Sequence, residues 1–213
     1  MALFSKLLQI EKGVTAIIGS GGKTTLLYRL AEELRELGNV IVCTSTHIFP
    51  PEHLPVVAQA EQVEGCICVG TPCENGKLTA PAQSFETLAA LADYVLVEAD
   101  GSKGLPLKAH LSHEPVIPAA AKNVICVVGA SGLNRRVSEV AHRPECFAHL
   151  AASEIADPMA VARVLEKEKL HSRVLINQAD SPERLAAARE LAGYLRCPVA
   201  VVSLQKGEIL CSY

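Results

Sequence analysis

The stretch Val14-Thr-Ala-Ile-Ile-Gly-Ser-Gly-Gly-Lys-Thr-Thr25 determines the fold class of this chain. An apolar run predicts a buried strand over Val14–Gly19, and it leads through glycines to Lys23. Thr24–Leu37 follows with leucines at helical spacing, so a strand, a glycine loop and a helix are predicted in direct succession. Backbone N–H groups at such a helix N-terminus attract an anion. The segment therefore predicts a loop that binds the phosphates of a nucleotide.

Each position of this loop has a predicted role in binding a nucleoside triphosphate. Glycine lets the backbone wrap around phosphate oxygens without a Cβ in the way. Lys23 is expected to bridge the β- and γ-phosphates as a catalytic residue, and the Thr24 hydroxyl is expected to reach Mg²⁺. The residues predicted to bind the nucleotide are Gly19, Ser20, Gly21, Gly22, Lys23, Thr24 and Thr25.

The loop is shorter than the usual phosphate-binding loop. Ile17 occupies the position six residues before the lysine, where the usual pattern has glycine. The short form Gly-x-x-Gly-Lys-Thr-Thr resembles the loop of the Mur ligases and folylpolyglutamate synthases. A glycine-rich turn with a chance lysine is the alternative, but the flanking strand and amphipathic helix favour a functional loop.

Apolar runs alternate with helical patterns along the rest of the chain, as in the predicted strand Arg173–Ile176 and the helix that follows it. This alternation predicts an α/β fold, namely a three-layer sandwich like that of the P-loop NTPases with a mostly parallel sheet. We expect one domain over residues 1–213, with a small hairpin insertion near residues 66–80 around Asn75-Gly76. The polar region Ala130–Arg143 is expected to be a mobile loop.

Composition restricts the classes of partner. The 213 residues are 49% hydrophobic and 20% charged with a formal net charge of −3, so neither a nucleic-acid surface nor a membrane surface is expected. We see no signal peptide and no apolar run of the ~20 residues that span a bilayer. The eight cysteines are then expected to be reduced thiols, which predicts a cytoplasmic protein.

Two acidic residues follow the predicted strand Tyr94–Val97. Glu98 comes directly after it, and Asp100 precedes a glycine. A phosphate-binding loop needs an acid on a neighbouring strand to hold Mg²⁺. We therefore expect Glu98 to bind Mg²⁺ together with Thr24, and Asp100 to act in catalysis by positioning water or an acceptor. A polar strand end that begins a loop is the alternative.

The segment Thr44-Ser-Thr-His47 ends the second predicted strand, at the edge of the sheet where open α/β folds bind ligands. Thr46, or alternatively Thr44, is expected to complete the Mg²⁺ shell. His47 is expected either to contact the phosphates or a second substrate, or to be structural.

The segment Asn177-Gln-Ala-Asp180 looks like the Asn-Lys-x-Asp motif with which GTPases read guanine, with Gln178 in place of lysine. Asn177 and Asp180 are therefore predicted to contact the base. Helix capping ahead of Ser181-Pro182 also explains them, so ATP and GTP both remain candidates.

A second, anionic substrate is predicted to lie close to the γ-phosphate. Lysines and histidines follow the acidic strand end directly, and Lys108 is expected to be catalytic. A solvated loop is the alternative explanation. The residues predicted for this second site are His47, Lys103, His110, His113, Arg135 and Arg143.

Several segments together resemble the YqeC family of accessory proteins of selenium-dependent molybdenum hydroxylases. They are Gly-Ser-Gly-Gly-Lys-Thr-Thr25, Thr-Ser-Thr-His47, Val-Glu-Ala-Asp-Gly-Ser-Lys103 with Pro-Leu-Lys108, His-Glu-Pro-Val-Ile-Pro118 and Asn-Gln-Ala-Asp180. The resemblance implies a role in the maturation of a selenium-containing molybdenum cofactor site. It thereby implies a molybdenum-cofactor or selenium species, or the hydroxylase apoprotein, as a partner.

Three functional hypotheses follow. The first is a Mg²⁺-dependent NTPase or phosphotransferase that binds ATP or GTP and serves cofactor maturation. The second is a nucleotide-gated chaperone or insertase for the apo-hydroxylase. The third is a Mur-like ligase, which the short chain disfavours because those enzymes carry extra domains.

Overall fold

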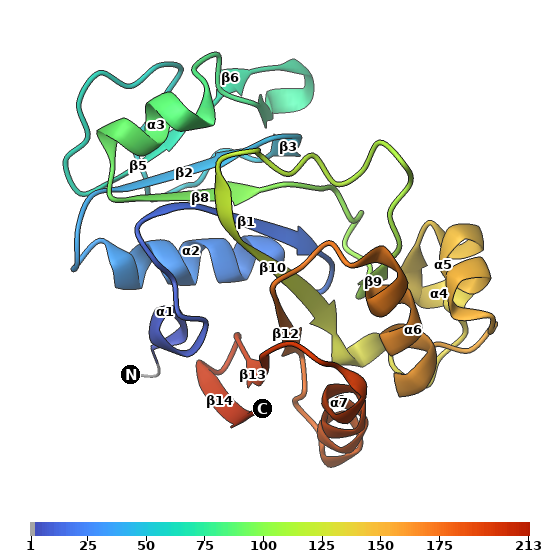
Figure 1. Ribbon diagram of the computed structural model, residues 1–213. Helices are drawn as coiled ribbons and strands as arrows, with labels where there is room; N and C mark the ends of the chain where they lie inside the picture. The colour runs from blue at the N-terminus through green and yellow to red at the C-terminus, as the bar shows by residue number, and fades with distance from the viewer. Residues whose placement is uncertain (1–2) are drawn as a thin grey trace.

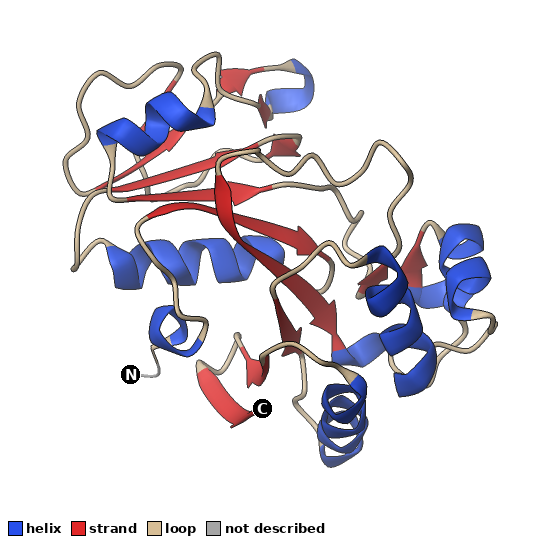
Figure 2. Cartoon of the chain, viewed as in Figure 1, coloured by secondary structure: helices blue, strands red, loops and turns tan. Residues whose placement is uncertain are grey.

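The structure, a computed structural model, describes residues 3–213; Met1 and Ala2, which the predicted domain includes, lie outside them. Within residues 3–213 nine strands form one sheet (Figures 1 and 2). Their order is β14 (Glu208–Ser212), β13 (Val199–Ser203), β12 (Arg173–Asn177), β10 (Ala121–Gly129), β1 (Gly13–Gly19), β8 (Tyr94–Glu98), β2 (Val40–Thr44), β5 (Cys66–Val69) and β4 (Val56–Val57). Neighbouring strands pair in parallel except β13 and β14. The α/β class and the mostly parallel sheet confirm the prediction.

Helices and two small sheets complete the described chain. The helices are α1 (Phe4–Leu7), α2 (Lys23–Leu34), α3 (Phe85–Leu91), α4 (Val137–Val140), α5 (Pro144–Ala151), α6 (Pro158–Glu168) and α7 (Pro182–Tyr194), with 3₁₀ turns η1 (Glu74–Gly76) and η2 (Ala130–Gly132). One small sheet joins β3 (His47–Ile48), β7 (Leu78–Thr79) and β6 (Thr71–Pro72), and the other joins β9 (Leu107–Lys108) and β11 (Ala141–His142).

Helices cover both faces of the sheet, which gives the predicted three layers (Figure 1). Side chains of β1 alternate between the faces: Ile17 packs with α1 and α2, whereas Ala16 and Ile18 pack in the cluster that contains α5, α6 and α7. α3 covers the same face as these last helices, over β2 and β8. Both sides of β1 are therefore buried, and its carboxyl end is held in place by two hydrophobic layers.

Helix α2 forms because its leucines recur at helical spacing. Leu26, Leu27, Leu30 and Leu34 are fully buried, and each such burial contributes about 1.5–3 kcal/mol. The helix ends at Leu34 rather than at the predicted Leu37, since the N–H groups of Leu37 and Gly38 both donate to the Leu34 carbonyl. α2 thus fixes the residues of the phosphate-binding loop at its N-terminus.

The prediction of a mobile loop over Ala130–Arg143 was wrong. The segment contains η2, α4 and β11, and it buries Leu133, Val137 and Val140. Its apolar residues are spaced among arginines and serines, so composition hid the core contacts. The predicted hairpin at Asn75-Gly76 is present, pairing β6 with β7, whereas Cys66–Val69 belongs to the main sheet.

No helix within the described residues is long and apolar enough to cross a membrane. The region of interest is instead the carboxyl edge of the parallel strands, where open α/β sheets bind ligands. β1 lies between β8 and β10 there, so the ends of three strands surround the glycine loop.

Candidate functional site

The loop between β1 and α2 has a backbone that requires glycine. Gly19, Gly21 and Gly22 have φ values of +88°, +92° and +130°, which L side chains rarely adopt. A Cβ at Gly21 would lie 2.5 Å from Gly129 Cα, and one at Gly22 would lie 2.4 Å from Asn177 Nδ2. The loop is therefore packed tightly against the ends of β10 and β12.

Hydrogen bonds from neighbouring strands tether the loop. The backbone N–H of Gly19 donates to Asp100 Oδ2 at 2.8 Å, and that of Ser20 donates to the Val127 carbonyl at 2.8 Å. Asn177 Nδ2 donates to the Gly21 carbonyl at 2.8 Å, while Asn177 Oδ1 accepts from the Leu204 N–H at 2.9 Å. The side-chain nitrogen and oxygen of the buried Asn177 are thus both hydrogen-bonded to the protein backbone.

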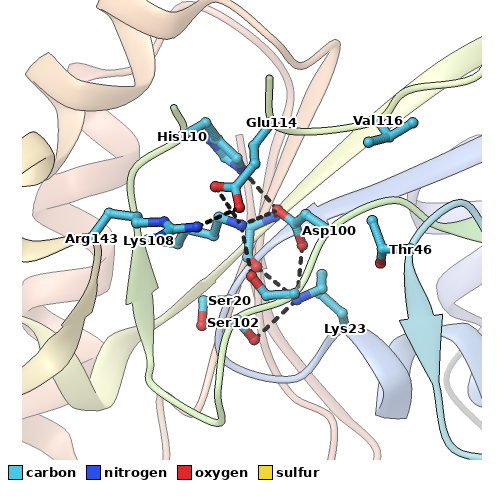
Figure 3. A network of polar contacts seen from close by, with 12 residues as sticks. Ser20, Lys23, Thr46, Asp100, Ser102, Lys108, His110, Glu114, Val116 and Arg143 are labelled. Atoms are coloured by element: carbon cyan, nitrogen blue, oxygen red, sulfur yellow. Dashed lines mark hydrogen bonds and ion pairs between the residues drawn. The ribbon is translucent and has the colours of Figure 1, made fainter. Parts of the chain in front are cut away.

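Lys23 is buried in the protein, with 4% of its surface exposed. Its Nζ donates to the Gly19 carbonyl at 2.8 Å and to Ser102 Oγ at 3.0 Å. It also lies 2.9 Å from Asp100 Oδ1 in an ion pair (Figure 3). The charge of Lys23 is therefore matched by a carboxylate of the chain itself.

Asp100 is the centre of a buried polar network. Besides Lys23 and Gly19, its carboxylate contacts His110 Nε2 at 2.8 Å and lies 3.7 Å from Lys108 Nζ. Burial raises the pKa of Asp100, but the hydrogen bond from His110 and the charges of Lys23 and Lys108 outweigh it and hold the pKa below its usual value. Asp100 is therefore ionised and faces the underside of the loop.

The network extends from Asp100 to α6. His110 Nδ1 lies 2.8 Å from Glu168 Oε2, and the His110 backbone N–H donates to Glu168 Oε1 at 2.7 Å. Burial lowers the pKa of His110, but the hydrogen bonds to Asp100 and Glu168 raise it by more than burial lowers it. The pKa of His110 therefore lies above its usual value. A protonated imidazole between two carboxylates links the last residue of α6 to the phosphate-binding loop.

A second arm of the network joins Lys108 to the start of α5. Lys108 Nζ lies 3.3 Å from Glu114 Oε2, and Arg143 donates to Glu114 Oε1 at 2.9 Å (Figure 3). Although burial raises the pKa of Glu114, Arg143 and Lys108 lower it to about 2. The network is charge-balanced: its cations are Lys23, Lys108, His110 and Arg143, and its carboxylates are Glu98, Asp100, Glu114 and Glu168.

Thr24 and Glu98 provide hard oxygen ligands beside Lys23. Thr24 Oγ1 donates to Glu98 Oε2 at 2.8 Å, and Glu98 Oε1 lies 3.9 Å from Lys23 Nζ. Burial raises the pKa of Glu98. A hydroxyl and a carboxylate that already touch at the N-terminus of α2 fit a Mg²⁺ ion, which prefers oxygen ligands. Thr46 Oγ1 lies 3.4 Å from Thr44 Oγ1, and Thr44 in turn donates to the Glu98 carbonyl.

A cavity of about 380 Å³ opens over the loop and α2. Segment 101–105, which we call the cover segment, forms one wall: Ser20 Oγ donates to the Leu105 carbonyl, and Lys108 Nζ donates to the Gly101 carbonyl at 2.6 Å. The residues that line the cavity are Gly21, Gly22, Lys23, Thr24, Thr25, His47, Ile48, Phe49, Lys77, Glu98, Gly101, Ser102, Lys103, Gly104, Leu105 and Gln178.

The structure brings some of the predicted site residues to this cavity and leaves others apart. His47 and Lys103 line it with the loop and Glu98, whereas the predicted His110, Lys108, Arg143 and Asp100 lie in the network behind the loop. Three predicted residues are exposed and lie outside the cavity lining: Asp180, His113 and Arg135, the last paired with Glu139 at 3.0 Å.

Four residues that the sequence reasoning missed contribute to the site. Lys77 and Phe49 line the cavity, Ser102 accepts from Lys23, and Glu168 holds His110. Lys77 follows the predicted Asn-Gly turn directly, but only the pairing of β7 with β3 carries it to the phosphate-binding loop. Sequence offered no signal for Glu168, which ends an ordinary amphipathic helix.

Two further cavities differ in chemistry. One of about 400 Å³ runs along α2 and shares Thr24 and Phe49 with the loop cavity, with Tyr28 and Cys66 among its lining. Burial raises the pKa of Tyr28 to about 12 and that of Cys66 to about 11, so both are neutral near pH 7. A larger cavity of about 880 Å³ lies between α1 and α2, away from the loop. The loop cavity is the candidate site because it gathers the functional groups.

Comparison with known proteins adds two findings. The profile of the family described as "YqeC protein" matches residues 15–145. An Escherichia coli (strain K12) protein described as "Uncharacterized protein YqeC" is 36% identical over 177 residues, which cover 70% of this chain and 67% of that protein. The matched residues 15–145 contain the loop, Glu98, Asp100 and the arm through Glu114 to Arg143.

Proposed function

The chain belongs to the YqeC protein family, and we propose that it binds a nucleoside triphosphate with Mg²⁺ and transfers or hydrolyses the γ-phosphoryl group. The observation that carries this proposal is the convergence of Lys23, Thr24 and Glu98 at the N-terminus of α2, on the wall of one cavity. A cation, a hydroxyl and a carboxylate at a glycine loop are the groups that phosphoryl transfer requires.

The chain's own residues have distinct roles in this proposal. The N–H groups of Gly21, Gly22 and the first turn of α2 hold the phosphates, because those of Gly19 and Ser20 already donate to Asp100 and Val127. Lys23 leaves its ion pair with Asp100 in part and donates to the β- and γ-phosphates. Asp100 and Lys108 act through Lys23 and the cover segment, because Asp100 is 1% exposed and faces the underside of the loop.

Thr24 and Glu98 would hold Mg²⁺, with Thr46 nearby. Bound there, Mg²⁺ would neutralise charge on the phosphate oxygens. Glu98 accepts from Thr24 already, so little rearrangement of the two side chains is needed to present their oxygens to the ion. Thr24 is exposed and lines the cavity, which suits it to this role.

The acceptor of the phosphoryl group is water or a small molecule. The cavity along α2 supports an acceptor, because it shares Thr24 and Phe49 with the loop cavity and so adjoins the expected γ-phosphate. Given the family, we propose that this reaction serves the maturation of a selenium-dependent molybdenum hydroxylase, with a molybdenum-cofactor or selenium species as the acceptor.

A second candidate function is a nucleotide-gated chaperone for the hydroxylase apoprotein. It is favoured by the buried connection from Lys23 through Asp100 to Glu168 and Arg143, at the ends of α6 and α5. A nucleotide that draws Lys23 away from Asp100 would change the charge balance at those helices. Turnover that a partner protein accelerates, with no small molecule modified, would favour this function over phosphotransfer.

Calorimetric titration with Mg·ATP, Mg·GTP and Mg·ADP tests the proposal. Wild type and a Lys6→Ala control are expected to bind, Lys23→Ala is expected to lose binding, and Thr24→Ala is expected to lose its Mg²⁺ dependence. Circular dichroism verifies that the variants are folded. Failure of the wild type to bind any of these nucleotides at millimolar concentration would refute the proposed function.

A further inference from the structure

The buried network behind the loop cannot give a triphosphate a net positive environment. Four cations face four carboxylates in it when Glu98 is included, and Lys23 is already matched by Asp100. A bound triphosphate carries more negative charge than one Mg²⁺ ion neutralises, and phosphoryl transfer spreads charge over the equatorial oxygens. Besides the N–H groups at the N-terminus of α2, lysines outside the network are the candidates to supply the remaining positive charge.

Two lysines of the cavity wall meet this need, namely Lys77 and Lys103. Within residues 3–213, no carboxylate lies within ion-pair distance of either ammonium group. Lys77 Nζ instead lies over the Phe49 ring, 4.8 Å from its centroid. A cation–π contact positions the ammonium group without cancelling its charge. Lys77 is thus an oriented and unpaired cation facing the cavity.

The packing of the hairpin fixes this position. Lys77 directly precedes β7, in which Leu78 is 3% exposed and packs with Ile48 and Cys68. β7 pairs with β3 in the register Ile48↔Leu78, so the backbone of Lys77 is anchored beside the segment that contains Phe49. The residue therefore belongs to the site through tertiary pairing, although it is distant from the loop in sequence.

The sheet order shows at which end of the cavity Lys77 lies. Gln178 follows β12 on one side of β1, whereas Glu98 ends β8 on the other side. Beyond β8 the main sheet continues with β2, β5 and β4, and the chain runs from the end of β2 directly into β3, the strand with which β7 pairs just after Lys77. Amides of the loop hold the α- and β-phosphates, and the Thr24–Glu98 pair marks the Mg²⁺ side. Lys77 lies beyond this pair, at the end where the γ-phosphate is expected.

We propose that Lys77 is a catalytic residue that contacts the γ-phosphoryl group and stabilises its charge during transfer, as an arginine finger does in other phosphoryl-transfer proteins. This inference rests on the proposed function. In the step, the oxygen of water or acceptor forms a bond to the γ-phosphorus while the bond to the β–γ bridging oxygen breaks. The nucleoside diphosphate leaves with the electron pair, and the proton of the nucleophile passes to water.

The test compares Lys77→Met, Lys77→Arg and Phe49→Leu with Lys6→Met, a matched control on α1 outside this cavity. We measure kcat and KM with Mg·ATP and Mg·GTP, and binding of Mg·ADP and Mg·GDP with and without fluoroaluminate, which mimics the transferring phosphoryl group. Lys77→Met should lower kcat by about 100-fold or more with KM changed only a few-fold. It should lose fluoroaluminate-dependent tightening while binding the diphosphates normally.

Lys77→Arg should recover most of the rate, and Phe49→Leu should fall between the wild type and Lys77→Met. A Lys77→Met variant with kcat within twofold of wild type, or one in which only KM changes, would overturn the role of Lys77 but leave the proposed function intact. Absence of nucleotide binding in the wild type would instead remove the proposed function itself. If the wild type binds without measurable turnover, the fluoroaluminate complex alone decides.

Discussion

Lys23 Nζ and Asp100 Oδ1 lie 2.9 Å apart, so the lysine that is expected to bind phosphate is already paired with a carboxylate. Asp100 comes from the segment after β8, and it also accepts from the Gly19 N–H. One buried carboxylate thus holds both the start of the phosphate-binding loop and the lysine at its end. Its removal is the most direct perturbation of the site.

Asp100→Asn should destabilise the fold by about 3 kcal/mol, because removing one member of a buried ion-pair network leaves its partners uncompensated. Urea unfolding followed by circular dichroism measures the change. Glu139→Gln, which breaks the exposed pair with Arg135, is the control and should cost less than about 1 kcal/mol. Equal effects of the two substitutions would contradict the central role of Asp100.

Gly22→Ala should destabilise the protein and abolish nucleotide binding. Its Cβ would lie 2.4 Å from Asn177 Nδ2, and its φ of +130° is unfavourable for alanine. Gly193→Ala in α7 provides the control, because its Cβ would meet no atom within 4 Å and alanine favours the helix. Thermal unfolding of both variants, with titration of Mg·ATP, checks this; retention of binding by Gly22→Ala would show that the loop adapts.

Substitutions of Asn177 and Asp180 should have different effects, because Asn177 holds the loop backbone and Asp180 is expected to contact the base. Asn177→Ala leaves the Gly21 carbonyl and the Leu204 N–H without their side-chain partner, so it should cost about 1–3 kcal/mol and weaken ATP and GTP binding alike. Asp180→Ala should leave stability unchanged, since Asp180 is exposed, and should alter only the ratio of GTP to ATP affinity. Calorimetry of both variants checks this; an unchanged ratio would remove Asp180 from base recognition.

The stability of the protein should depend on pH through His110. Its pKa is raised in the folded state by Asp100 and Glu168, so the folded form binds the proton more tightly than the unfolded form. This stabilisation is fully present below the unfolded pKa of about 6.5 and is lost as pH rises through the folded pKa. Urea unfolding between pH 5 and 9 should show this decline in wild type but not in His110→Gln. An equal decline in stability in the wild type and in His110→Gln would show that another group causes the pH dependence.

The periodicity of apolar residues in the sequence predicts much of the fold, but local sequence patterns predict only part of the site. The glycine loop and the acids after β8 carry local signals, and parallel strands meet at one edge, so Lys23 and Glu98 could be placed together. The role of Lys77 depends on a hairpin that pairs with a two-residue strand, and that of Glu168 on the docking of α6. Such contacts join residues distant in sequence, and no local pattern reports them.

The same limit explains why the sequence around Asp100 predicts a substrate site from its basic residues. Lys108, His110 and Arg143 have the chemistry of anion binding, but their anions are Asp100, Glu114 and Glu168 of the chain itself. Residue type indicates what a side chain can bind. Only the packing of α5 and α6 decides that the partner is internal.

The hydrogen bonds that hold the glycine loop determine which segment must become ordered when a nucleotide binds. Because Asp100, Val127 and Asn177 hold the backbone of Gly19, Ser20 and Gly21, the loop that presents the following N–H groups to a phosphate is already ordered, and binding costs this loop little conformational freedom. The cover segment is held at its ends, where Lys108 donates to the Gly101 carbonyl and Ser20 to the Leu105 carbonyl, but a Cβ at Gly104 between them would meet no atom within 4 Å. The ordering cost of nucleotide binding therefore falls on the middle of the cover segment, and a substitution at Gly104 would change affinity without altering a phosphate contact.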